Sequence, residues 1–249
     1  MPARWWARSR SAQARTTGYP TSTNRASSFH LRWGGLPSGV PLVEAAATLE
    51  IVEGPVTAEL YFWALQVTFS DRYRSTGGAH LGLQWHPPHP GATAANFGGY
   101  RVGGGELAGS ESSWPSATSN PNTRDFPWQT NRRYRLAVSA SSRPGWWDGT
   151  VDGLVIRRLA GGGSRLDHLM VWSEVFARCD DPAVTIRWTD LEAVAADGTR
   201  HRPDRVTVTY QSGPDGGCAN TDVALDGVGI VQRTNGARGV PHGTTLALP

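Results

Sequence analysis

The sequence predicts an all-β fold, built as a two-sheet antiparallel sandwich or jelly roll. Short runs of apolar residues alternate with polar ones, which is typical of strands with one buried face. Turn residues separate these runs at the spacing of a sandwich. The 249-residue chain contains 11 tryptophans and 30 glycines, a combination that suits large aromatic anchors between tight turns. A chain of this length can bury a large core as one unit.

The clearest strand pattern lies in the first half of the chain. Its alternating residues, which share one face of an extended strand, are Tyr61, Trp63, Leu65, Val67 and Phe69. The strands expected in this half lie near residues 29–33, 42–52, 57–69, 79–85 and 97–102. The run 42–52 is ambiguous, because its three consecutive alanines at 45–47 also favour a helix.

The second half continues the same rhythm. Strands are expected near residues 133–139, 149–159, 168–177, 183–195, 205–211, 222–226 and 228–232. Val206, Val208 and Tyr210 alternate with threonines, which indicates a half-buried strand. The pairs Asp152-Gly153 and Asp197-Gly198 predict tight hairpin turns.

The segment 103–129 breaks this rhythm. It begins with three glycines and continues with serine, proline, asparagine and threonine, among which Trp114, Phe126 and Trp128 are embedded. Long loops that carry aromatic residues are often binding loops or lids. We therefore include Trp114 and Trp128 among the candidate ligand-binding residues.

The charge pattern divides the chain into a basic leader, residues 1–27, and one domain, residues 28–249. Residues 1–32 hold six of the 24 arginines and no acid, so the rest of the chain balances 18 arginines against 21 acidic residues. This removes the case for a nucleic-acid-binding face. We expect the leader to be disordered; it lacks the apolar segment of a secretory signal, and it also fits a transit peptide or a misassigned start. No run is long enough to predict a membrane span.

The two cysteines, Cys179 and Cys218, lie in turn-like segments. A bond between them would close a 39-residue interval and stabilise the fold by about 4 kcal/mol in the chain-entropy model, and it would imply export. The alternative is two reduced, partly buried thiols.

Two groups of tryptophans and acids are candidate saccharide sites. Trp172 and Glu174 share a strand face, so the aromatic surroundings can raise the pKa of the Glu174 carboxyl, which could hydrogen-bond a sugar hydroxyl. The alternative is that Glu174 forms an ion pair with an arginine. Trp188, Asp190 and Glu192 also share a predicted face, where an indole platform and two acceptors suit a pyranose ring. Paired carboxylates also serve glycosidases, but residues two apart near a strand end, such as Asp190 and Glu192, are very often just solvated surface.

The histidine-rich segment 80–89 carries a possible metal site. His80, Gln84 and His86 share a predicted strand face, and His89 follows. Zinc needs a third or fourth ligand, so we interpret this face as polar surface and predict no metal and no cofactor. The Asp-Gly pairs along the chain are explained by turns and build no EF-hand loop, and no phosphate-binding or nucleophile-elbow motif is present.

Several motifs carry a resemblance to a family. They are GGAHLGLQWH (77–86), NFGGY (96–100), YRLAV (134–138), VWSEVF (171–176) and GGCANT (216–221). With them the chain resembles an uncharacterised family of secreted domains from high-GC Gram-positive bacteria. The resemblance implies a concanavalin A-like sandwich, export to the outside or surface of the cell, and a bond between the two cysteines.

We therefore expect a noncatalytic carbohydrate-recognition domain with a polysaccharide or glycan as its partner. The first alternative is a carbohydrate-active hydrolase or lyase that uses Glu174, Asp190 or Glu192 as the catalytic residue. The second is a structural or cell-surface interaction domain without a small ligand. Neither the ligand nor the oligomeric state follows from the sequence.

Overall fold

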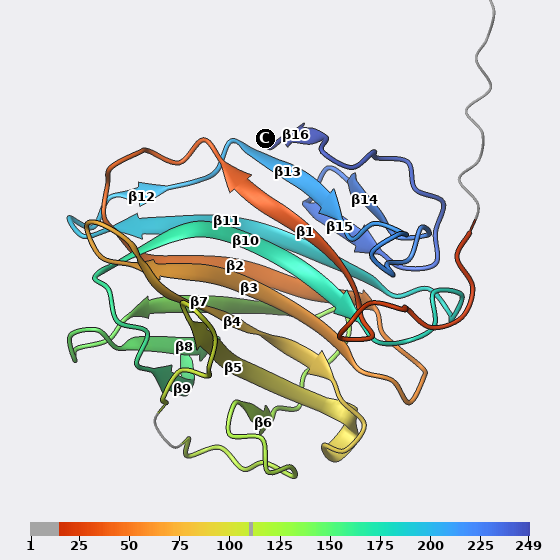
Figure 1. Ribbon diagram of the computed structural model, residues 1–249, viewed down its shortest axis with the longest axis horizontal. Coiled ribbons are helices and arrows are strands. Elements are labelled where there is room, and N and C mark those ends of the chain that lie inside the picture. Colours follow the sequence, from red (N-terminus) through yellow and green to blue (C-terminus); the bar gives the residue numbers. More distant parts are fainter. Residues whose placement is uncertain (1–14, 110–111) are drawn as a thin grey trace, which may run out of the picture.

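The computed structural model, which describes residues 15–109 and 112–249, confirms the all-β prediction (Figure 1). All its strand pairs are antiparallel, and a single 3-10 turn, η1 (Pro90–Ala92), interrupts them. The strands are β1 (Ser27–Gly34), β2 (Leu42–Glu53), β3 (Tyr61–Ser70), β4 (Ser75–Trp85), β5 (Thr93–Arg101), β6 (Thr123–Asp125), β7 (Arg133–Ala140), β8 (Trp147–Val151), β9 (Leu154–Leu159), β10 (Arg165–Val175), β11 (Thr185–Ala195), β12 (Arg200–His201), β13 (Arg205–Tyr210), β14 (Asp222–Leu225), β15 (Ile230–Arg233) and β16 (Thr245–Ala247).

These strands form two layers. The front layer in Figure 1 has the order β16-β13-β1-β10-β3-β4-β5-β6, and the back layer has the order β14-β15-β11-β2-β7-β8-β9 with β12 beside β11. A bridge between Leu166 of β10 and Leu42 of β2 joins the layers, so that hydrogen bonds connect all 16 strands. The predicted two-sheet sandwich is therefore the observed architecture.

The core lies between the two layers. The alternating face predicted for β3 is buried there, with Trp63 1% and Phe69 0% exposed. Gln232 of β15 adds a polar link across this core. Its Oε1 accepts hydrogen bonds from Ser173 Oγ and Trp188 Nε1, and its Nε2 donates to the carbonyl of Phe29. These partners belong to both layers, so Gln232 fixes one layer against the other.

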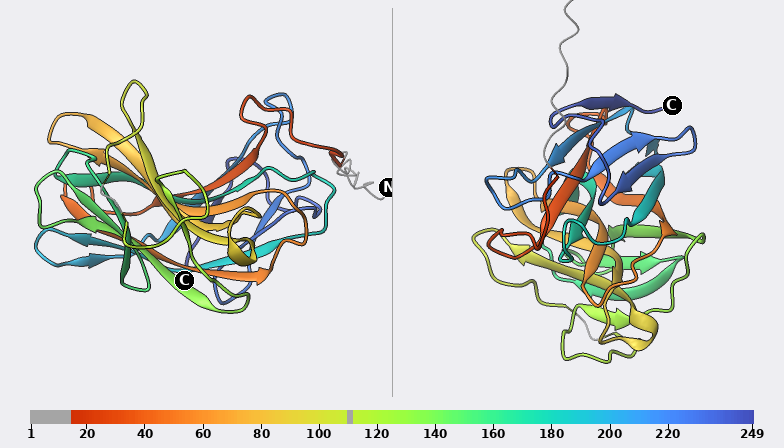
Figure 2. Two further views of the ribbon diagram at one scale, coloured as in Figure 1. Left: turned by 90° about the horizontal axis from the view of Figure 1, so that it is seen from below. Right: turned by 90° about the vertical axis from the view of Figure 1, so that its right-hand side faces the viewer.

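The front layer is curved, and its solvent-facing side is the inner side of the curve (Figure 2, left). We call this surface the concave face; it consists of the outward-pointing residues of β1, β10, β3, β4 and β5. The loops at the two ends of the layer rise beside it. In β3 and β4, the residues that alternate with those of the concave face point into the core; Leu65 and Leu81, for example, are 0% exposed. The concave face is thus the free surface of a sheet whose other side is fixed by packing.

Several details differ from the sequence prediction. The ambiguous run at residues 42–52 is strand, because its alanines pack between neighbouring strands on both sides. The expected strand 149–159 is two strands, which turn at Asp152 and Gly153 with positive φ at both positions. The short strands β6, β12 and β16 were not predicted. No helix in the described part of the chain is long and apolar enough to cross a membrane.

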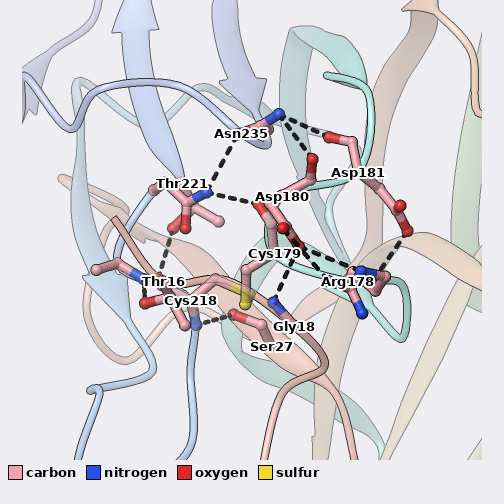
Figure 3. The surroundings of a disulfide bond; sticks show 12 residues. Thr16, Gly18, Ser27, Arg178, Cys179, Asp180, Asp181, Cys218, Thr221 and Asn235 are labelled. Atoms are coloured by element: carbon pink, nitrogen blue, oxygen red, sulfur yellow. Dashed lines mark hydrogen bonds and ion pairs between the residues drawn. A yellow bond between two sulfur atoms is a disulfide. The ribbon is translucent and has the colours of Figure 1, made fainter. Parts of the chain in front are cut away.

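Part of the predicted leader contacts the domain. Residues 1–14 lie outside the described residues, whereas residues 15–26 hydrogen-bond to the loops of the domain. They form a strap against the loops around Cys179 and Cys218, which are joined by a disulfide with a Cα–Cα distance of 5.4 Å (Figure 3). The Gly18 carbonyl accepts a hydrogen bond from the Cys179 amide, and Thr21 N donates to Gly216 O. The predicted bond between the cysteines is therefore present.

Candidate functional site

Three rows of side chains cross the concave face, each built from residues that are directly paired on neighbouring strands. The first row is Ser28, Glu174, Phe62, Gln84 and Ala94. The second row is His30, Trp172, Ala64, Gly82 and Asn96. The third row is Arg32, Met170, Gln66, His80 and Gly98. Since paired residues of adjacent strands point to the same side, these side chains share one surface.

A continuous series of aromatic rings runs across these rows; we call it the aromatic band. Its ring-centroid distances are 6.2 Å from His30 to Trp172, 5.0 Å from Trp172 to Phe62, 5.4 Å from Phe62 to His80, and 6.4 Å from His80 to Tyr100. Trp172 and Phe62 are buried, whereas Tyr100 is 55% exposed at the end of the band. The band therefore has a rigid middle and one accessible ring.

Small residues lie in the middle of the face. Ala64 and Gly82 are buried there, and Ala64 forms a separate apolar cluster with Phe62 and Trp172 on this side of the sheet. A Cβ atom at Gly82 would lie 1.9 Å from the carbonyl oxygen of Trp63 on the neighbouring strand. Glycine at this position thus permits the close approach of β3 and β4 in the middle of the face.

Two amide side chains beside the band have buried acceptor atoms without a partner. Gln84 and Asn96 are each 5% exposed. Asn96 donates from Nδ2 to Thr123 Oγ1 at 2.8 Å, but its Oδ1 and the Oε1 of Gln84 accept no hydrogen bond from the described residues. Leaving such an atom unpaired costs about 1–3 kcal/mol. Both oxygen atoms are also inaccessible to solvent, so a ligand hydroxyl can reach either of them only after the side chain has moved outward.

Glu174 is the acidic group of the first row. It accepts hydrogen bonds from Asn24 Nδ2 at 2.8 Å and from Ser28 Oγ at 3.4 Å. Burial raises the pKa of this carboxyl above its usual value, and the two donors oppose that shift. Burial also lowers the pKa of His80 to about 4, and it is the main cause of the lowered pKa of His30. Both imidazoles are therefore neutral at neutral pH.

The structure places Trp172 and Glu174 on one face, as predicted. Trp172 is only 6% exposed, however, and its Nε1 donates to Gln66 Oε1 at 2.9 Å. It acts as the fixed centre of the band and offers little open surface of its own. Phe176, two residues beyond Glu174, is partly exposed at the end of the strand, where it lines a cavity with Glu59 and residues 19–23 of the strap.

The predicted platform at Trp188 is wrong. Trp188 is 0% exposed between the layers, and so it offers no face for stacking. A β-bulge at residues 189–192, with φ of 51° at Asp190, shifts the alternation of β11. As a result Asp190 is exposed, whereas Glu192 turns to the outer face of the back layer and pairs with Arg135 and Arg200. Trp188 and Asp190 both line a cavity at this edge of the back layer, but Glu192 does not.

The loop tryptophans also have structural roles. Trp128 is 6% exposed, packs edge-on against Trp63 and donates from Nε1 to the carbonyl of Gln84. Trp114 is partly buried against Phe126, at a ring distance of 5.5 Å. Neither indole belongs to the concave face. Residues 110–111 of this loop lie outside the described part of the chain.

The histidine segment divides between two places. His80 and Gln84 share the concave face, as predicted, whereas His86 and His89 lie in the turn after β4. The His89 ring contacts Asp125 through Nδ1 at 2.5 Å. Within residues 15–109 and 112–249, no three histidine, cysteine, aspartate or glutamate side chains are grouped as a metal would require.

The sequence analysis missed several residues of the face, above all Phe62, Gln66, Asn96 and Tyr100. Their roles depend on which strands are neighbours, and no local pattern in the sequence specifies this. Asn24 was missed for another reason, because it lies in the segment predicted to be disordered. The motif 96–100, which contains Asn96 and Tyr100, was the one signal that pointed to this part of the chain.

Comparisons with known proteins give only distant similarity. No family model and no curated protein matches the sequence. A solved structure of SCP-B, a member of the eqolisin family of peptidases in a complex with the tripeptide Ala-Ile-His, is similar at a TM-score of 0.45 and 11% identity over 88% of this chain and 99% of that chain. The carbohydrate-binding module CBM66 from Bacillus subtilis is similar at a TM-score of 0.34 and 10% identity, over 61% of this chain and 73% of that chain. A protein of unknown function with a galectin-like fold, also from Bacillus subtilis, is similar at a TM-score of 0.34 and 13% identity, over 76% of this chain and 90% of that chain. None of these similarities assigns a family to the chain.

Proposed function

We propose that the protein binds carbohydrate on its concave face without cleaving it. The observation that carries this proposal is the aromatic band, which leads from the buried rings of Trp172 and Phe62 to the exposed ring of Tyr100, together with the partly exposed carboxylate of Glu174 beside it. A sugar ring has apolar C–H faces, which favour aromatic side chains, and hydroxyl groups, which need acceptors. The concave face offers both on strands whose positions are fixed by the core.

The accessible end of the band is the expected stacking surface. Tyr100 exposes its ring there, and His80 supports it from the adjacent strand. A sugar chain that starts on Tyr100 and follows β5 passes the row of His80 first and reaches the row of Asn96 about 13 Å from Tyr100. The front layer curves around this face along its length, and such a curved surface fits an extended chain better than a single monosaccharide (Figure 2).

The positions of the carboxylates favour binding over hydrolysis. Glycosidases use two carboxyl groups about 5–9.5 Å apart. Asp125 is paired with Ala94, so it lies in the row of Glu174 but four strands away, at about 19 Å from the strand spacing. Asp190 and Glu192 belong to the back layer, and Glu192 is already paired with arginines.

One observation favours a catalytic role as a second candidate. Burial raises the pKa of Glu174, and a carboxyl group with a raised pKa is a better proton donor near neutral pH. In a hydrolase or lyase this residue would be the acid or base. The role predicts released oligosaccharide that disappears in Glu174→Gln, whereas binding alone predicts no product.

We also propose that the protein acts outside the cell or at its surface. The disulfide between Cys179 and Cys218 supports this location, because such bonds persist mainly in oxidising compartments. The resemblance to secreted domains of high-GC Gram-positive bacteria agrees with it. Fractionation of a source culture, followed by immunodetection, tests the location directly.

Polysaccharide depletion tests the binding function. Purified protein is incubated with a panel of insoluble and soluble glycans, and the unbound fraction is measured. We expect selective depletion by at least one polymer, and a loss of about fivefold in affinity in Tyr100→Ala. Tyr73→Ala is the matched control, since Tyr73 is 85% exposed on a turn outside the face. Binding that both variants retain equally would contradict the proposed surface.

A further inference from the structure

The arginines of the two outer faces differ in their partners. On the outer face of the back layer, arginines are neutralised by carboxylates. The ion pairs there are Arg133–Glu50, Arg135–Glu44, Arg135–Glu192, Arg187–Glu50, Arg187–Asp226, Arg200–Glu192 and Arg233–Glu53. Such a face presents little net charge to a ligand.

The concave face contains an arginine in a different situation. Arg32 is exposed on β1, between Met170 of β10 and Thr207 of β13. In the described residues, no carboxylate lies within 4 Å of its guanidinium group. Glu174 is paired with Ser28, four positions back along β1, so it lies about 13 Å away along the strand. Arg32 therefore offers an unneutralised charge to the face.

The neighbours of Arg32 on the concave face are aromatic and apolar side chains. Met170 packs beside the cluster of Phe62 and Trp172, and the charge of Arg32 reaches His30, whose pKa it helps to lower. The Trp172 indole is fixed by Gln66 in the same part of the face. If the anionic group of a ligand binds Arg32, the rest of that ligand lies beside His30 and Met170, at one end of the aromatic band.

We infer that the concave face selects acidic saccharides, and that Arg32 binds the carboxylate of a uronic acid residue. This inference rests on the proposed carbohydrate-binding function and names its ligand class. Arginine binds a carboxylate through two parallel N–H donors, which gives direction as well as charge.

The test compares acidic polymers with neutral ones on the full chain. The probes are polygalacturonate, alginate and hyaluronan, with methyl-esterified polygalacturonate and neutral glucans as their counterparts. We expect polygalacturonate or another uronate polymer to bind about tenfold more tightly than the neutral polymers. Arg32→Gln should abolish this preference, so that uronate and neutral polymers bind with equal affinity. Arg72→Gln, which removes the same charge from an exposed turn, should keep the preference.

The outcomes that contradict the inference can be distinguished from those that contradict the proposed function. Equal binding of acidic and neutral polymers, or a preference that survives in Arg32→Gln, overturns the role of Arg32 but leaves carbohydrate binding intact. No binding of any glycan overturns the proposed function itself. Polyglutamate serves as a further probe, because equal binding of this acidic peptide would show that the face selects anions and not saccharides. Circular dichroism of both variants establishes that they are folded.

Discussion

The side-chain amide of Asn24 donates a 2.8 Å hydrogen bond to the carboxylate of Glu174, across a separation of 150 residues. Asn24 lies in the strap, which hydrogen bonds and the disulfide loops hold at the end of the concave face. The strap therefore contributes directly to the electrostatics of the proposed binding surface. A segment that resembles a disordered tail in sequence completes the first row of the face.

The raised pKa of Glu174 predicts how stability depends on pH. The pKa of the Glu174 carboxyl is higher in the folded protein than in the unfolded chain. Its contribution to stability is therefore fully present at pH values below the unfolded-state pKa, and it is lost as the pH rises through the folded-state pKa. Glu174→Gln removes the ionisation, so we expect a higher Tm than wild type at pH 7 and no gain at pH 3. Thermal unfolding across this range checks the prediction. A gain that is the same at both pH values would contradict it.

Removing the disulfide should destabilise the protein and release the strap. The double variant Cys179→Ala with Cys218→Ala avoids a lone thiol, and the chain-entropy model predicts a loss of about 4 kcal/mol in the free energy of unfolding. Urea denaturation measures this loss. Hydrogen exchange should become faster at the amide of Thr21, which bonds to the loop of Cys218. Unchanged exchange there would show that the strap is held without the bond.

Trp188 should affect stability and not ligand binding. It is 0% exposed and its Nε1 donates to Gln232, so Trp188→Ala is expected to cost about 3–5 kcal/mol. Urea denaturation gives the cost, and glycan binding is then measured at a temperature where the variant remains folded. A loss of binding without a loss of stability would restore Trp188 as a ligand platform.

Gln232 should contribute as much to the free energy of unfolding as a large apolar core residue. Gln232→Leu removes the partner of three buried groups, Ser173 Oγ, Trp188 Nε1 and the Phe29 carbonyl. Because unpaired buried groups cost about 1–3 kcal/mol each, we expect at least 3 kcal/mol of destabilisation by urea denaturation. Gln232→Glu at low pH offers a control that keeps the shape. A neutral effect of the leucine variant would show that the neighbours find other partners.

Much of the fold follows from local patterns, whereas the site does not. The alternation from Tyr61 to Phe69 identified the buried side of β3, and the Asp152-Gly153 turn marked the end of β8. The bulge that breaks the alternation after Trp188 has no distinct local signature, so the predicted face of β11 was wrong. The rows of the concave face join five strands that are scattered along the chain. Such pairings depend on the whole topology, and single-strand patterns cannot reveal them.

The position of β1 has a consequence for how the chain is made. β1 lies between β10 and β13, with Leu31 paired to Val171 on one side and to Val208 on the other. During synthesis from the N-terminus, both partners leave the ribosome long after β1. Until then β1 is an apolar strand with two open edges, which is the kind of segment that aggregates or recruits chaperones. Both edges of β1 can therefore be paired only in chains synthesised beyond β13.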